Sequence, residues 1–179
     1  LRPRAIIEIV QSLNNNVVEE IFSEMDTEDV VDVFERSTVE EAEDLLDILN
    51  KSTKLVINKR LAYPKDSVGR LMSEEVAKIS KGITVKEALD ELKTLHTSVE
   101  DIVYVYSVDD ENILSGVLSF REIVFADHKE LIENVMIPNP ISIHPTADQE
   151  EAARLIKQYE LLALPVVDKN NMLIGQATI

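Results

Sequence analysis

A diverged internal repeat over residues 69–179 is the feature that most constrains how this chain can fold. Residues 84–92 align without a gap with residues 148–156, and the apolar positions of the two segments coincide. Farther along, residues 108–119 align with residues 167–178. Because both blocks recur in the same order, the sequence predicts a structural unit that occurs twice.

Each copy of the repeat predicts a helix, a strand, a hairpin turn and a second strand. The offset between the copies shifts by five residues between the two blocks, and a longer loop at residues 96–101 of the first copy accounts for this shift. Gly116 and Gly175 hold matching positions in the second strands, where we expect a bulky side chain to be excluded. Met72 and Met136 also match, and we interpret them as core residues.

Residues 3–62 contain no convincing strand and read as short helices, because their apolar residues recur at helical spacing. Four apolar groups show this spacing, at residues 6–10, 17–22, 30–34 and 45–49. Helix starts are predicted at three capping segments, Asn14 to Asn16, Asp26-Thr27 and Ser37-Thr38. Helices this short must stack on one another to be stable, which predicts a superhelical bundle.

Pro64 disfavours helical geometry in the residue before it, so we expect the helical part to end there. The sequence thus predicts an α+β protein with an acidic, all-α N domain at residues 1–62. A linker and the first repeat copy follow at residues 63–127, and the second copy at residues 128–179.

The chain is strongly acidic, with 34 acidic against 18 basic side chains and a net charge of −16. Such a charge repels nucleic acids and anionic membrane surfaces, and it favours cations as partners. Acidity also serves solubility, so charge alone does not predict a metal site. The absence of cysteine excludes disulfides and thiolate zinc sites. The three histidines belong to no catalytic motif, so we expect no enzyme activity.

The repeated helix and the hairpin, with Leu-x-Gly-x-x-Ser/Thr in each second strand, resemble a tandem pair of CBS domains. That pair consists of two β-α-β-β-α units, and the resemblance implies that the second unit is truncated here before its last helix. Residues 63–72 and 148–155, together with the acidic helical domain in front, resemble magnesium transporters of the MgtE family.

The family resemblance implies the order helical N domain, CBS pair, connecting helix and transmembrane domain. This chain contains no apolar run of the roughly 18 residues that a spanning helix needs. We therefore expect a soluble regulatory fragment from the cytoplasmic face of the cell membrane, with the transporter's own transmembrane domain outside it. The resemblance also implies a homodimer that forms through the CBS domains.

Mg²⁺ takes oxygen ligands, so convergent carboxylates are the residues to examine. Glu28 and Asp32 are four residues apart on a predicted helix and therefore share a face. Asp148 and Glu150 lie in the first turn of the second repeat's helix, and Glu160 follows its end. Acids in a first turn also complement the helix dipole, which is an alternative explanation for Asp148 and Glu150.

In MgtE proteins, acids at these matched positions bind Mg²⁺ between the N domain and the CBS pair. The resemblance implies seven metal-site residues: Glu28, Asp32, Arg70, Asp148, Glu150, Lys157 and Glu160. Arg70 and Lys157 match positions that offer a backbone carbonyl, and Glu28 and Glu160 stand where aspartate is expected. The implied mechanism is a switch in which Mg²⁺ bridges the two acidic faces, closes the assembly and gates the pore.

CBS pairs also bind adenine nucleotides, and the resemblance implies a site for ATP. Tyr104 is suited to stack on the base and Arg121 to meet phosphates, beside Ser119 at the end of a strand. Glu122 stands where an aspartate holds the ribose, and its extra methylene misplaces the carboxylate, so we expect weak binding or none. The alternative for Arg121 is a structural role as a surface ion-pair partner. A nucleotide-sensing CBS module attached to an enzyme or to another transporter remains the alternative function.

Overall fold

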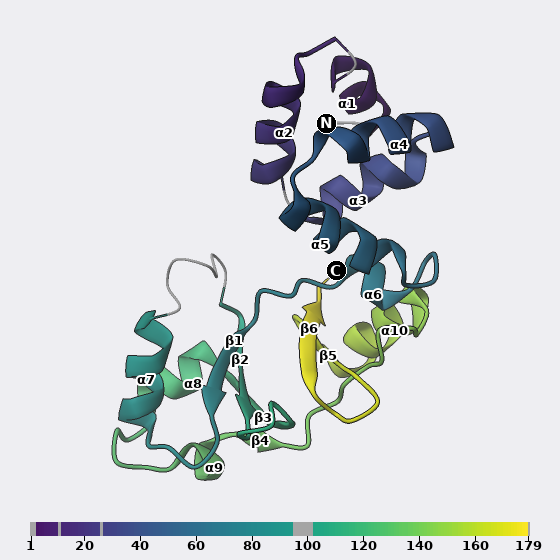
Figure 1. The fold of residues 1–179 in the computed structure, drawn as a ribbon. Helices are drawn as coiled ribbons and strands as arrows, with labels where there is room; N and C mark the ends of the chain where they lie inside the picture. Colours follow the sequence, from purple (N-terminus) through teal and green to yellow (C-terminus); the bar gives the residue numbers. More distant parts are fainter. Residues whose placement is uncertain (1–2, 11, 26, 95–101, 179) are drawn as a thin grey trace. The chain divides into compact units, whose positions relative to one another are not determined.

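The computed structural model describes residues 3–10, 12–25, 27–94 and 102–178 (Figure 1). The chain forms two compact units, Leu1–Lys65 and Asp66–Ile179, which we call the N-terminal and the C-terminal unit. The longer loop predicted at residues 96–101 lies outside the described residues, as does the predicted helix cap at Asp26.

The described part of the N-terminal unit is helical, as predicted. Its helices are α1 (Pro3–Val10), α2 (Asn15–Glu24), α3 (Thr27–Arg36), α4 (Val39–Ile48) and α5 (Lys51–Leu61). Helix α1 packs against α3 and α3 against α5, while α2 packs against α4 (Figure 1). Helices two apart in sequence are therefore neighbours, which is the arrangement of a short superhelical stack. Its core includes Val18, Phe22, Val33 and Ile57.

Two of the predicted helix starts are confirmed by their side-chain hydrogen bonds. Asn14 caps α2, because its side-chain oxygen accepts a hydrogen bond from the backbone N–H of Asn16 at 2.8 Å. Thr38 caps α4 in a reciprocal arrangement with Glu41, whose carboxylate accepts the Thr38 backbone N–H at 2.8 Å. Each bond satisfies a backbone donor that the first helical turn leaves without a partner.

Helix α5 is not among the helices that the apolar groups predict. It lacks an apolar stripe, since Ile57 is buried but Leu55 is 72% exposed. Its start is nevertheless specified in the sequence, because Asn50 accepts a hydrogen bond from the backbone N–H of Thr53 at 2.9 Å. The capping residue Asn50, rather than the spacing of the apolar residues, is therefore the sequence feature that indicates helix α5.

The C-terminal unit contains two sheets. The first is four-stranded, in the order β1 (Ala77–Ser80), β2 (Tyr104–Val108), β3 (Leu114–Ser119) and β4 (Ile137–Pro138). Strand β1 runs parallel to β2, whereas β3 is antiparallel to both β2 and β4. The second sheet is the antiparallel pair β5 (Leu164–Val167) and β6 (Leu173–Ala177). The helices are α6 (Val68–Leu71), α7 (Val85–Thr94), α8 (Phe120–Phe125), α9 (Ile132–Val135) and α10 (Gln149–Tyr159).

The predicted repeat is present, since α7, β2 and β3 of the first copy correspond to α10, β5 and β6 of the second. The short helices α6 and α9 also correspond, and each packs on the other copy. The backbone N–H of Val68 in α6 bonds to Ala147 of the second copy at 2.8 Å, and that of Ile132 in α9 bonds to Ile83 of the first at 2.9 Å. The two copies are therefore interlocked by their leading segments.

The two hairpins meet at the centre of this unit. The N–H of Leu114 bonds to the carbonyl of Asn171, and the N–H of Leu173 bonds to the carbonyl of Asn112, both at 3.0 Å. Both asparagines have a positive φ, 63° for Asn112 and 64° for Asn171, which asparagine tolerates in a tight turn. Next to this contact Tyr106 is fully buried, which raises the pKa of its hydroxyl above the ordinary value.

The prediction that bulky side chains are excluded at both glycines of the repeat is confirmed, because a chain segment lies close to each of them. A Cβ on Gly116 would collide with the side chain of Met136, and a Cβ on Gly175 would lie 2.6 Å from the backbone oxygen of Ser73 and 3.1 Å from the sulfur of Met72. Met72 is 2% exposed and Met136 packs against the core of the first copy, which confirms both methionines as packing residues.

We expect Gly175→Ala to destabilise the C-terminal unit more than Gly116→Ala does. The atom that opposes a methyl group at Gly175 is a backbone oxygen, which cannot move independently, whereas Met136 has a flexible side chain. Overpacking of this kind costs about 1–3 kcal/mol, and we expect Gly175→Ala near the upper end. Urea unfolding followed by tyrosine fluorescence reports mainly on this unit, which holds three of the four tyrosines. Equal losses for the two variants would contradict the close backbone approach at Ser73.

Candidate metal and nucleotide sites

Two of the predicted metal residues, Glu28 and Asp32, lie four residues apart on α3 in the N-terminal unit. Their spacing places them on one face of the helix. The side chain of Asp32 is half-buried, and that of Glu28 lies outside the described residues. Helix α3 carries further acids but only one base in its last turn, Arg36, so its surface is predominantly negative.

Three other predicted residues gather at the start of α10. Asp148 is the N-cap residue, and its Oδ1 accepts the backbone N–H of Glu150 at 2.7 Å. Both side chains are exposed. Helix α6, which carries Arg70, packs against α10, and Ser67 just before α6 forms a backbone bridge with Asp148. The interlocked leading segment is therefore what brings Arg70 to this end of α10.

Lys157 and Glu160 lie at the other end of α10. The helix has 11 residues, so its two ends are separated by about 17 Å at a rise of about 1.5 Å per residue. Mg²⁺ holds its ligands at about 2.1 Å, which excludes one ion bound by both ends. The candidate residues of the C-terminal unit therefore divide into two groups, one at each end of α10.

Glu160 has an unusual backbone conformation. It ends α10 with φ 52° and ψ 39°, the left-handed region in which helices usually place glycine or asparagine. The other described non-glycine residues with positive φ are all aspartate or asparagine: Asp66, Asn112, Asn139 and Asn171. Glu160 is thus the one whose side chain does not favour this conformation, and such strain concentrates at functional sites.

Within the described residues, no three Asp, Glu or His side chains converge in a way that could hold a metal ion. Asp148, Glu150 and Glu160 project from the C-terminal unit at two separate places, and Asp32 belongs to the N-terminal unit. The assignment of these residues to Mg²⁺ stays a prediction.

The predicted nucleotide residues come together at one end of the paired inner strands β2 and β3. Tyr104 at the start of β2 pairs in register with Ser119 at the end of β3, and Arg121 and Glu122 follow in α8. The hydroxyl of Tyr104 lies 3.5 Å from the backbone nitrogen of Leu162, which belongs to the second copy.

The carboxylate of Glu122 turns back onto Ser119. It accepts the backbone N–H of Ser119 at 2.7 Å and its hydroxyl at 2.9 Å, while the Ser119 hydroxyl accepts the N–H of Glu122 at 3.1 Å. This reciprocal arrangement is a capping box. The sequence prediction missed it, although Ser-x-x-Glu is its signature. The same signature recurs at Thr84 and Glu87, where hydrogen bonds from Thr84 lower the pKa of the Glu87 carboxyl.

Comparison with known families identifies both parts of the chain. The MgtE intracellular N domain matches residues 1–66, and the CBS domain matches residues 68–129 and 132–179. The chain is 36% identical to the magnesium transporter MgtE of Bacillus subtilis over 88% of its own length and 35% of that protein. It is likewise 36% identical to MgtE of Thermus thermophilus, over 75% of its length and 30% of that protein.

A solved structure matches almost the whole chain. It is the cytosolic domain of the Mg²⁺ channel MgtE in complex with ATP, at 31% identity and a TM-score of 0.87, over 99% of this chain and 73% of that one. The chain belongs to the MgtE family. The predicted fold, a helical N domain followed by a CBS pair, is thereby confirmed.

The chain spans about a third of the length of its curated MgtE relatives. None of its described helices is both long and apolar enough to cross a bilayer.

Proposed function

We propose that this chain is the Mg²⁺-sensing regulatory region of a magnesium transporter, located on the cytoplasmic side of the membrane and without catalytic activity. The observation that carries the proposal is the placement of exposed acids at both ends of α10, with Asp148 and Glu150 at its start and Glu160 at its left-handed end. Membership of the MgtE family supports magnesium as the ligand.

Electrostatic repulsion supplies the switch. The N-terminal unit carries a net charge of −6 and the C-terminal unit −10, counted from their sequences. Exposed charges act only within about 8 Å at physiological ionic strength, so repulsion matters where acidic faces approach. We infer that Mg²⁺ bridges such faces at high concentration and that the two units separate at low concentration. In the full transporter this closure would gate the pore.

Each candidate residue has a chemical role in this proposal. Asp148 uses Oδ1 to cap α10, and its second carboxylate oxygen remains suited to a cation. Glu150 adds a carboxylate in the same turn, and Asp32 supplies one from the N-terminal unit together with Glu28. Glu160 would act at the far end of α10, where Lys157 contributes its backbone carbonyl, as Arg70 does near Asp148.

We expect the double variant Asp32→Asn with Asp148→Asn to be more compact than the parent without metal, because repulsion is relieved. Its further compaction by millimolar Mg²⁺ should be blunted, because ligand oxygens are lost. Asparagine also caps helices well, so α10 should keep its start. Small-angle X-ray scattering measures the radius of gyration with Mg²⁺ and with EDTA.

The matched control is Glu20→Gln with Glu130→Gln, which removes one exposed acid from each unit. We expect its Mg²⁺ response to equal that of the parent. If the control pair blunts the response as strongly as the test pair, sensing is diffuse charge neutralisation and the assigned residues are wrong.

ATP is the second ligand that we propose, because a related MgtE cytosolic domain is found in complex with ATP. Tyr104, Ser119 and Arg121 would contact it beside Glu122. The capping box competes with this role, since the Glu122 carboxylate already accepts two hydrogen bonds from Ser119. We therefore infer weak ATP binding.

We expect ATP to bind the parent chain with a Kd above about 10 µM, which corresponds to about −7 kcal/mol. Glu122→Asp should tighten binding, because the shorter side chain cannot close the same capping box and can face the ribose instead. Isothermal titration calorimetry in EDTA measures both affinities. A parent Kd well below 10 µM would contradict the view of Glu122 as a defect.

We also propose that the chain forms a homodimer through its CBS domains. Helix α8 exposes an apolar face, with Phe120 41%, Val124 43% and Phe125 80% exposed. Covering this face by a second copy would remove apolar surface from water.

We expect Phe125→Asp to shift sedimentation-velocity profiles toward the monomer, because a charge would have to be buried in the interface. Leu55→Asp serves as the control, since Leu55 is 72% exposed on α5 of the other unit. A dimer that survives Phe125→Asp, or that dissociates equally with Leu55→Asp, would exclude α8 as the contact.

A further inference from the structure

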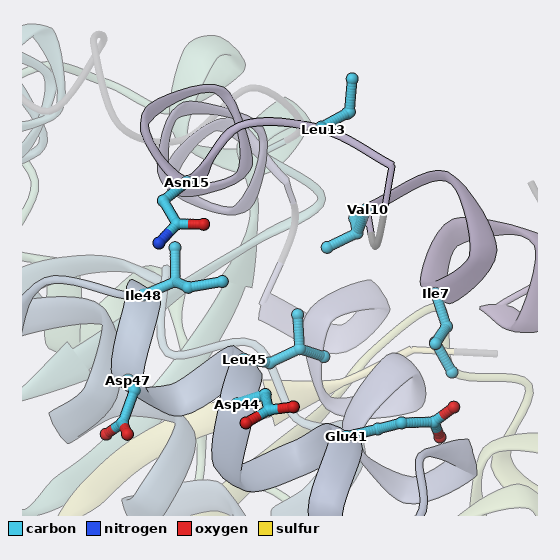
Figure 2. Close-up of a pocket in the computed structure, with 9 residues that line it drawn as sticks. All are labelled: Ile7, Val10, Leu13, Asn15, Glu41, Asp44, Leu45, Asp47 and Ile48. Carbon is cyan, nitrogen blue, oxygen red and sulfur yellow. The ribbon is translucent and has the colours of Figure 1, made fainter.

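The N-terminal unit contains a pocket of about 460 Å³ between α1, the turn that leads into α2, and α4 (Figure 2). Four of its apolar side chains come from two helices, with Ile7 and Val10 on α1 and Leu45 and Ile48 on α4. Ile7, Val10 and Leu45 are each at most 5% exposed, so they form a floor built into the core of the unit. The neighbouring Leu13 is 37% exposed at the edge of the pocket.

One side of the pocket is acidic. Glu41, Asp44 and Asp47 follow each other at intervals of three on α4, which makes them neighbours on the helix surface. Helix α4 contains no basic residue that could offset them. Glu41 is engaged in the capping box with Thr38, whereas the side chains of Asp44 and Asp47 are exposed. Like charges at this spacing destabilise a helix until a cation approaches.

The apolar floor and the acidic side together restrict what can occupy the pocket. A metal ion alone would use the carboxylates but not the apolar floor, and no metal-binding group of three acids occurs among the described residues. An anionic partner, such as a nucleic acid, would be repelled by the acidic side. A basic, apolar surface satisfies both features. An amphipathic helix offers such a surface, with apolar anchors at helical spacing between basic residues.

We propose that this pocket docks a cationic amphipathic helix of a partner protein. Apolar side chains spaced three or four residues apart would insert between α1 and α4, over Ile7, Val10 and Leu45. Lysine or arginine on the flank of the docked helix would pair with Asp44 and Asp47. This docking site is separate from the proposed magnesium and nucleotide residues, and none of them lines it.

The test uses the whole chain and a fluorescein-labelled peptide of about 18 residues, long enough to form a helix on docking. The peptide carries leucines at positions i, i+3, i+4 and i+7 and lysines elsewhere, and a scrambled peptide of the same composition lacks the apolar stripe. Fluorescence anisotropy should give saturable binding of the amphipathic peptide. The Kd of the scrambled peptide should be at least about tenfold higher, because the two peptides carry the same charge and differ only in the apolar stripe.

Variants of the chain separate docking from general attraction between opposite charges. The double variant Asp44→Asn with Asp47→Asn should raise the Kd for the amphipathic peptide at least about fivefold, because two ion pairs at a partly covered surface are lost. Glu40→Gln with Glu43→Gln removes two exposed acids at the same spacing on α4 that do not line the pocket, and it should change Kd less than about twofold. Asn15→Trp should block the pocket without changing its charge.

Circular dichroism should give the parent spectrum for each variant. If Asn15→Trp does not fold, the double variant Asp44→Asn with Asp47→Asn alone tests whether the peptide binds at this pocket. Three results would overturn the proposal. They are the absence of saturable binding, equal binding of the scrambled peptide, and an equal loss of affinity in the Glu40 and Glu43 control.

Discussion

The arrangement of the C-terminal unit depends on the exchange of the leading segments between the two repeat copies. Met72 crosses Gly175 of the second copy and Met136 crosses Gly116 of the first, so each glycine gives room to a segment that precedes the opposite copy. Helix α6 is thereby tied to Ala147 and placed beside the start of α10. Arg70 precedes the first copy and Asp148 belongs to the second, and this interlocking is what makes them neighbours. A substitution that loosens the crossing should therefore disturb the candidate metal residues without touching any of them.

Negative charge is the second constraint, because it is distributed over both units rather than confined to a tail. Carboxylates that repel one another reduce stability unless they cap helices or bind cations. Several acids here do cap helices, and Asp148 combines a cap with exposure of its carboxylate. Capping gives Asp148 a structural role, which adds to the alternative that the sequence left open, the complementation of the helix dipole. It does not explain Glu160, whose side chain stabilises no first helical turn and whose backbone is strained.

Much of the fold could be predicted from the sequence, because a duplicated pattern gives the same information twice. The matching positions of Gly116 and Gly175 predicted that bulky side chains are excluded there, and the structure supplies the reason, a chain segment that lies close to each glycine. Helix α5 could not be found from periodicity, since it buries Ile57 and Arg60 but leaves Leu55 in solvent. The capping box at Ser119 was visible in the sequence as Ser-x-x-Glu. Whether the Glu122 carboxylate bonds to Ser119 depends on the conformation of its side chain, which the sequence does not give. The candidate metal residues were named from the family resemblance and stay a prediction, because they belong to two units and no local pattern encodes whether acids far apart in sequence converge.

The position of Tyr104 adds a structural relation between the candidate sites. Its hydroxyl lies 3.5 Å from the N–H of Leu162, two residues beyond Glu160. The segment from Glu160 to Leu162 therefore follows the C-terminal end of α10 and contacts the N-terminal end of β2. A ligand that stacked on Tyr104 would rest against this segment, whose backbone is already strained at Glu160. Coupling between two sites requires an element that both can bias, so if the two candidate sites bind their ligands, this short connection is the segment that both would contact.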